Sequence, residues 1–147
     1  VDLPPGTGDA QLTLAQGVPM AGAVIVTTPQ TVALLDARKG LRMFQQMQVP
    51  VLGIVENMSY LVVPGTGQRI DVFGQGGGKK TADAMNVPFL GELALNPEVR
   101  IGGDSGKPIT TQGESDAGAA PFYELARKLD ASCSALKPAG PKIEIED

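Results

Sequence analysis

Histidine and tryptophan are missing from this sequence, and cysteine occurs only once, at Cys133. Without histidine the chain cannot form a Ser-His-Asp triad, a histidine-ligated zinc site or a haem site with a histidine ligand. One cysteine excludes an internal disulfide and any metal site that needs several cysteines from one chain. Free thiols are typical of reducing compartments, so we predict a cytoplasmic location.

Aromatic residues and positive charge are also in short supply. Aromatic residues make up 4% of the chain, and 12 lysines and arginines face 16 acidic residues, which gives a net charge of −4. A base-stacking platform or a basic surface for nucleic acid is therefore not expected. No apolar run approaches the roughly 20 residues of a membrane span, and the first residues lack a signal-peptide pattern, so we expect no membrane association.

The 147 residues, of which 42% are hydrophobic, are enough for one domain with a core. Continuous apolar runs at 21–27, 49–55 and 87–93 are typical of strands buried on both faces. Between the first two runs, apolar residues at spacings of three and four predict a long helix. This alternation predicts an α/β fold with a mostly parallel sheet. We assign residues 1–130 to the domain and 131–147 to a flexible tail.

Residues 58–73 interrupt this alternation of strands and helices. Two short runs that contain apolar residues flank Pro64-Gly65-Thr66-Gly67, and this turn-forming sequence predicts a β-hairpin inserted at the surface. The chain then returns to a helix before the third strand, and a final helix is predicted to end near Leu129.

Two helix starts can be predicted from capping residues. Asp9 is a candidate N-cap for a short helix over 10–16. Thr28 is expected to cap the long helix, with Pro29 at its first position, where the missing N–H has no cost.

Ligands of parallel α/β sheets bind at the carboxyl ends of strands, so polar residues at these ends are the candidates for function. Val1-Asp2-Leu3 is predicted to end a strand before a loop rich in proline and glycine, and this placement of Asp2 suits a carboxylate that contacts Mg²⁺ indirectly in an NTPase. Gly6 and the neighbouring loop glycines would let the backbone approach a γ-phosphate. An exposed aspartate in an ordinary turn is the alternative.

Asn57 is the second candidate, because it directly follows a buried run. Its amide offers both a donor and an acceptor, which match the N6 and N7 edge of adenine. An Asx turn after the strand explains the same residue equally well.

The glycine-rich run 74–78, followed by Lys79-Lys80-Thr81, imitates a phosphate-binding loop. That pattern needs four residues between its first glycine and Gly-Lys-Ser/Thr, whereas three are present, and Lys80 replaces the hydroxyl that binds Mg²⁺. The run also follows a hairpin rather than a buried strand. We therefore interpret it as a flexible entry to a helix, and these 147 residues contain no phosphate-binding loop.

Several motifs occur in a fixed order along residues 1–130. They are Val1-Asp2-Leu3-Pro4-Pro5-Gly6-Thr7-Gly8-Asp9, Thr27-Thr28-Pro29-Gln30, Gly53-Ile54-Val55-Glu56-Asn57-Met58-Ser59, Phe73-Gly74, Pro88-Phe89-Leu90-Gly91 and Gly103-Asp104-Ser105-Gly106-Lys107-Pro108. Together they resemble the Mrp/ApbC family of iron–sulfur cluster carriers, which are P-loop ATPases related to MinD. The resemblance implies a MinD/ParA-like sheet, truncated at its N-terminus and carrying an inserted β-hairpin.

The resemblance also implies roles for individual residues. Asp2 and Gly6 match the family's switch II loop, with the aspartate near Mg²⁺, and Asn57 and Pro97 match positions on the two sides of the adenine. The cofactors implied are ATP and Mg²⁺. The partners implied are a second copy of the chain, joined through the 58–73 hairpin, and apoprotein clients of iron–sulfur assembly.

Two features depart from the family pattern. The family's phosphate-binding loop precedes the first of these motifs, and because the chain opens at Val1 without an initiator methionine, we expect that loop upstream. ATPase activity is therefore expected of the intact protein and not of this chain alone. Val63 and Thr66 stand where the family has two cysteines that hold a cluster across a dimer, and neither side chain is a suitable iron ligand, so no metal site is assigned.

The function implied by the resemblance is ATP binding in the assembly or transfer of iron–sulfur clusters. Because the cysteines are replaced, a non-catalytic nucleotide-binding or scaffold module is the alternative. A further alternative is a MinD-like positioning ATPase on membranes, but the acidic end of the chain, Glu144-Ile145-Glu146-Asp147, lacks the basic amphipathic helix that this function requires.

Overall fold

A three-stranded parallel sheet forms the centre of the fold in the computed structural model, which describes residues 1–3 and 8–136. Its strands lie in the order β1 (Ala23–Thr27), β2 (Val51–Glu56) and β5 (Phe89–Glu92). Both neighbouring pairs are parallel, so each connection must cross the sheet. The crossovers contain α2 (Thr31–Gln46) and α3 (Gly77–Met85). The three predicted strands and the parallel α/β architecture are confirmed.

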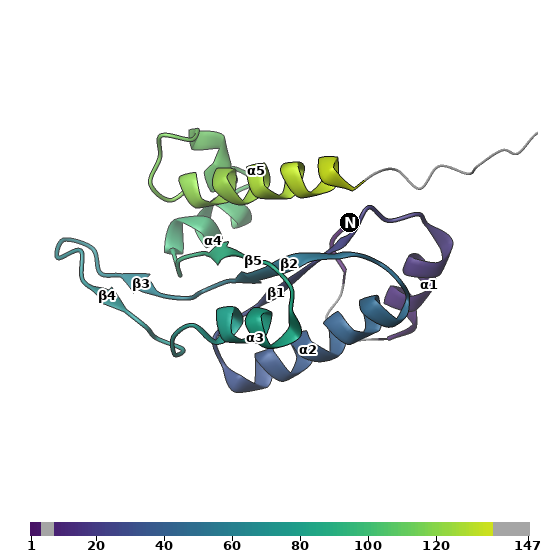
Figure 1. Ribbon diagram of the computed structural model, residues 1–147. Helices are drawn as coiled ribbons and strands as arrows, with labels where there is room; N and C mark the ends of the chain where they lie inside the picture. The colour runs from purple at the N-terminus through teal and green to yellow at the C-terminus, as the bar shows by residue number, and fades with distance from the viewer. Residues whose placement is uncertain (4–7, 137–147) are drawn as a thin grey trace, which may run out of the picture.

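Helices cover both faces of the sheet (Figure 1). On one face, α2 and α3 enclose the larger core, which includes Ile25, Leu41, Phe44, Ile54 and Ala82. On the other face, α5 (Ala120–Ala135) packs against β2 and β5 through Phe122, Leu125 and Leu129. No described helix covers β1 on that second face, and Val26 is accordingly 61% exposed.

Leu41 of α2 is completely buried, whereas Leu35 of the same helix is 51% exposed. Truncation of Leu41 to alanine is expected to lower the free energy of unfolding by about 2–5 kcal/mol, because it removes buried methyl groups and leaves a cavity. Leu35→Ala is the matched control and should change stability by less than about 0.5 kcal/mol. Urea unfolding followed by circular dichroism measures both values. Equal losses would show that the α2 face is assigned incorrectly.

The predicted surface hairpin is confirmed. It consists of β3 (Leu61–Val62) and β4 (Arg69–Ile70), which pair in antiparallel orientation. The hairpin projects from the body of the molecule beyond the sheet (Figure 1). Two residues per strand are too few to hold a hairpin rigidly on their own, so its orientation depends on contacts with the rest of the chain.

Arg69 makes one set of these contacts. Its guanidinium bonds the carboxylate of Asp71 at 3.0 Å and that of Glu92, at the end of β5, at 3.2 Å. It also lies over the ring of Tyr60, 4.0 Å from the centroid. The hydrogen bond to Asp71 and the nearby carboxylate of Glu92 raise the pKa of Arg69 above its usual value. These groups are partly exposed, so solvent weakens the pairs.

The remaining elements are α1 (Asp9–Gly17), α4 (Pro97–Asp104) and the 3₁₀ turn η1 (Ile109–Gln112). The α4 helix begins with proline at its first position, and the Asn96 side chain caps it by accepting the Glu98 N–H at 2.9 Å. Among residues 1–3 and 8–136, no helix is long and apolar enough to cross a membrane.

Three predicted helix ends are wrong. The N-cap of α1 is Gly8 rather than Asp9. Asp9 lies in the first turn, where its negative charge interacts favourably with the helix dipole. The α2 helix begins at Thr31, because the backbone of Gln30 is still extended, so Pro29 lies before the helix. At the other end of the chain, α5 continues to Ala135. Residues 131–135 are therefore helical, and 137–147 lie outside the described residues.

Candidate functional site

A groove of about 960 Å³ runs along the free edge of β1. Its lining comes from residues 1–3, α1, β1, α2 and the end of β2. Asp2, Thr27, Thr28 and Asn57 all line this groove. Thr27, Thr28 and Asn57 lie at the carboxyl end of the sheet, where ligands of parallel α/β sheets bind.

Asp2 is exposed on this groove and makes no hydrogen bond or ion pair with the part of the chain that the structure describes. The neighbouring Leu3 packs against the larger core and holds the segment in place. Residues 1–3 form no strand, although Val1–Leu3 was predicted to end one, because none of the described strands pairs with them. Gly6 lies outside the described residues.

Asn57 is held at the end of β2 by its backbone. Its N–H donates to the carbonyl oxygen of Thr27 at 2.7 Å, which continues the β1–β2 ladder. Its side-chain Oδ1 accepts the N–H of Met58 at 2.9 Å, and Met58 has a left-handed φ of 52°. This bond to the next residue is not an Asx turn, which bonds two residues on. The Nδ2 group makes no hydrogen bond with the described residues and can donate to a ligand.

Pro97 occupies a different place from Asn57. It begins α4, which follows β5, and it is not among the described residues that line the groove. The structure therefore brings Asp2 and Asn57 to one cavity and leaves Pro97 outside it.

The glycine-rich run opens α3, as predicted, and the structure explains its composition. A Cβ on Gly77 would lie 2.9 Å from the carbonyl oxygen of Pro29, and a Cβ on Gly78 would lie 2.9 Å from Oε2 of Glu56. The N–H of Gly78 donates to that same carboxylate. A carboxylate of the chain itself thus occupies the helix N-terminus, where a phosphate would bind in a true P-loop.

Glu56 stands beside Asn57 among the polar residues at strand ends, but the sequence alone assigned it no role. It is completely buried at the end of β2, and its Oε1 accepts the Ser59 hydroxyl at 2.5 Å. Buried carboxylates are rare and are paired when they occur. The available signal was a charged residue that directly continues the apolar run 51–55.

The hairpin turn holds no cluster ligands. The Val63 N–H donates to the Gln68 carbonyl at 2.9 Å, and Thr66 Oγ1 accepts the Gln68 N–H at 3.3 Å. Cys133 is exposed near the end of α5, and that end of α5 points away from the hairpin (Figure 1). Among the described residues, no group of three His, Cys, Asp or Glu side chains could hold a metal ion.

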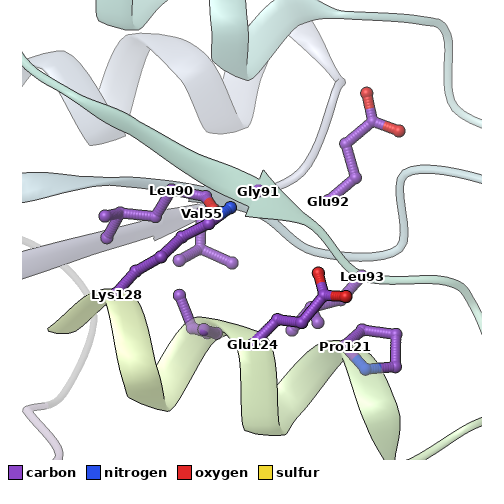
Figure 2. Close-up of a pocket in the computed structure, with 9 residues that line it drawn as sticks. Val55, Leu90, Gly91, Glu92, Leu93, Pro121, Glu124 and Lys128 are labelled. Atoms are coloured by element: carbon purple, nitrogen blue, oxygen red, sulfur yellow. Dashed lines mark hydrogen bonds between the residues drawn. The ribbon is translucent and has the colours of Figure 1, made fainter. Parts of the chain in front are cut away.

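A second cavity lies between β5 and α5 (Figure 2). Its volume is about 60 Å³, which suffices for a few water molecules and not for a nucleotide. Lys128 reaches across it from α5, and its Nζ donates to the carbonyl oxygen of Leu90 at 2.6 Å. This cavity is part of the packing of α5, and the groove beside β1 is the candidate site.

Comparison with solved structures bears on the fold. A nucleotide-binding protein from Archaeoglobus fulgidus, solved in complex with ADP, is 40% identical with a TM-score of 0.64 over 71% of this chain and 43% of that one. The cell division ATPase MinD of Pyrococcus furiosus is 25% identical with a TM-score of 0.65 over 88% of this chain and 50% of its own. The MinD-like fold predicted from the sequence is confirmed.

Sequence comparison identifies the family. The iron–sulfur cluster carrier protein of Synechocystis is 59% identical over 88% of this chain and 37% of its own length. The iron–sulfur cluster transfer protein NUBPL of Dictyostelium discoideum is 46% identical over 87% of this chain and 40% of its own. The chain thus spans less than half the length of these relatives. Residues 1–130 match the ParA family model for the NUBPL iron-transfer P-loop NTPase, and the chain belongs to this family.

Proposed function

We propose that this chain supplies the adenine side and the switch carboxylate of an ATP site in an iron–sulfur cluster carrier. The observation that carries the proposal is the groove beside β1, which is lined by Asp2, Thr28 and Asn57, the last two at the carboxyl end of the sheet. Ligands of open α/β sheets bind at this end. The Archaeoglobus relative, described as a nucleotide-binding protein, was solved with ADP and shares this fold.

The residues present fit Mg²⁺ only together with a nucleotide. Asp2 is an exposed carboxylate on the groove, whereas three acidic, cysteine or histidine ligands do not come together among the described residues. Mg²⁺ in such sites is bound by one or two carboxylates, by phosphate oxygens and by water. When bound, the ion would neutralise phosphate charge, and Asp2 would hold one of its waters. Asn57 would donate from Nδ2 to a ring nitrogen of the adenine.

An NMR titration with Mg·ADP tests this assignment. We expect the backbone resonances of Thr27, Thr28 and Asn57 to shift with a dissociation constant near or above about 1 mM, because no phosphate-binding loop occurs in these residues. Asn57→Ala should remove most of the shift, and Mg·GDP should produce less of it.

Asn96→Ala is the matched control, because Asn96 caps α4 and does not line the groove. It should leave the titration unchanged. The proposed site would be contradicted by resonance shifts confined to α5. It would also be contradicted if no shifts occurred at a Mg·ADP concentration 10-fold above the expected dissociation constant. A micromolar constant would show that the chain holds phosphate by itself, contrary to the absence of the loop pattern.

The cargo proposed for the protein is an iron–sulfur cluster, delivered to apoprotein clients in a reducing compartment such as the cytoplasm. The relatives are named as carriers or transfer proteins of such clusters. We further propose that two copies meet through the hairpin, where Val62, Ile70 and Val72 are each more than 40% exposed. Apolar groups gathered on a projecting element are typical of protein interfaces.

A scaffold module remains the second candidate, and a specific observation favours it. Val63 and Thr66 of the hairpin have no thiol, and Cys133 lies on a different element. In this second function the groove would still bind nucleotide, and the hairpin would bind a partner without a cluster.

A further inference from the structure

The carboxylate of Glu56 joins three parts of the chain. Oε1 accepts the hydroxyl of Ser59 at 2.5 Å, and Oε2 accepts the backbone N–H of Gly78. Glu56 and Ser59 are completely buried, and Gly78 is buried as well. Hydrogen bonds to a charged acceptor are stronger than neutral ones, and burial removes the competition from water.

The two donors mark the two ends of the inserted segment. Ser59 lies just before the hairpin, and Gly78 lies just after the chain has returned from it to begin α3. A single carboxylate therefore closes the base of the insertion. The contact between Gly78 and the carboxylate is close, because a Cβ added to Gly78 would lie 2.9 Å from Oε2. Any residue other than glycine would therefore require a shift of the surrounding atoms.

The neighbouring hydrogen bonds extend this base into the sheet. The N–H of Ser59 donates to the carbonyl oxygen of Leu93 at 2.9 Å. The N–H of Leu93 donates in turn to the backbone carbonyl oxygen of Glu56 at 2.8 Å. The next residue, Asn57, is bonded to Thr27 of β1 and lines the groove. The residue that anchors the hairpin is thus adjacent to the residue proposed to contact the adenine.

We propose that Glu56 is a positioning residue that holds the hairpin in one orientation relative to the sheet end at Asn57. The strands of the hairpin are only two residues long, so its base must supply the rigidity. The other tie, from Arg69 to Glu92, is partly exposed and is weaker. The consequence for function rests on the proposed nucleotide site: the partner-binding hairpin and the adenine contact are held by one carboxylate and so are coupled in orientation.

Distance measurement between two spin labels tests this proposal without nucleotide, so its outcome is separate from that of the nucleotide titration. One label is placed on the native Cys133, which is exposed on α5, and the other on Gln68→Cys in the exposed hairpin turn. Double electron–electron resonance on the full chain should give a narrow distance peak. Glu56→Gln should lose this narrow peak, because the amide can no longer accept both donors.

Three further variants separate orientation from stability. Ser59→Ala removes one of the two bonds and should broaden the peak to a smaller extent. Glu92→Gln removes the charge of the exposed ion pair with Arg69 and should leave the peak narrow. Ile54→Val loosens the completely buried core beside the site, and it should lower stability without broadening the peak.

Two results would overturn the proposal. One is a narrow peak that persists in Glu56→Gln and in Ser59→Ala; if Glu56→Gln does not fold, Ser59→Ala alone decides. The other is a broadening in Glu92→Gln or Ile54→Val as large as that in the Glu56 and Ser59 variants, because the orientation would then depend on Arg69 or on overall stability.

Discussion

Replacement of Val63 and Thr66 together by cysteine is expected to create an iron–sulfur cluster site in the hairpin. A [4Fe–4S] cluster is usually held by four thiolates. The native chain has one cysteine, at Cys133, so a pair of chains supplies two thiolates. The double variant would add two per chain on one turn, where the Gly67 N–H donates to the Val63 carbonyl at 3.0 Å. Two hairpins then provide the full set.

Anaerobic reconstitution with iron and sulfide, in a Cys133→Ser background, measures this gain. We expect a visible absorption band and about four iron atoms per two chains for the double cysteine variant. The matched variant Val63→Ser with Thr66→Ser should bind none, and light scattering should show that the cluster-loaded form is a dimer. The ligand assignment would be wrong if the native hairpin bound stoichiometric iron in the Cys133→Ser background. The dimer proposal would fail if the loaded variant remained monomeric.

The free edge of β1 is expected to produce the largest contrast in amide hydrogen exchange within the sheet. Alternate residues of a parallel strand direct their N–H groups to opposite edges. The register places the N–H groups of Ile25 and Thr27 toward β2, so those of Val24 and Val26 point to the groove. None of the described residues bonds the N–H of Val24 or Val26.

Exchange at Val24 and Val26 should therefore be faster than at Ile25 and Thr27 by at least about 100-fold, because the paired amides open only with larger unfolding events. Residues 1–3, which belong to no strand, should also exchange rapidly. Mass spectrometry or NMR on a dilute, monomeric sample gives these rates. A second sample at high concentration is the control, since pairing between exposed edges would slow exchange there. Strong protection of Val26 in the monomer would show that the edge has an internal partner.

The sequence by itself determined the architecture and the family. Strands that are buried on both faces require continuous apolar runs, and the runs at 21–27, 49–55 and 87–93 are local features that the structure confirms. The hairpin was also predictable from a local feature, because turn-forming residues determine the backbone conformation of the few residues around them. The ordered motifs over residues 1–130 were sufficient to identify the family that the comparisons confirm.

Helix ends were less predictable because tertiary contacts compete with local capping. Pro29 suits the first position of a helix. In the structure, α2 begins only at Thr31, and the Pro29 carbonyl oxygen lies close against Gly77 of α3. The loop before α2 thus packs against the distant helix α3. The preference of Pro29 for a first helical position did not predict where α2 begins.

Only the tertiary structure decided where the polar groups of the site find their partners. Glu56 and Gly78 are 22 residues apart, and they meet because the hairpin returns the chain to the end of β2. Asp2 and Asn57 are 55 residues apart in the sequence, and both line the groove beside β1. Periodicity and propensity depend on near neighbours in the chain, whereas the environment of a buried carboxylate depends on which distant segments pack around it.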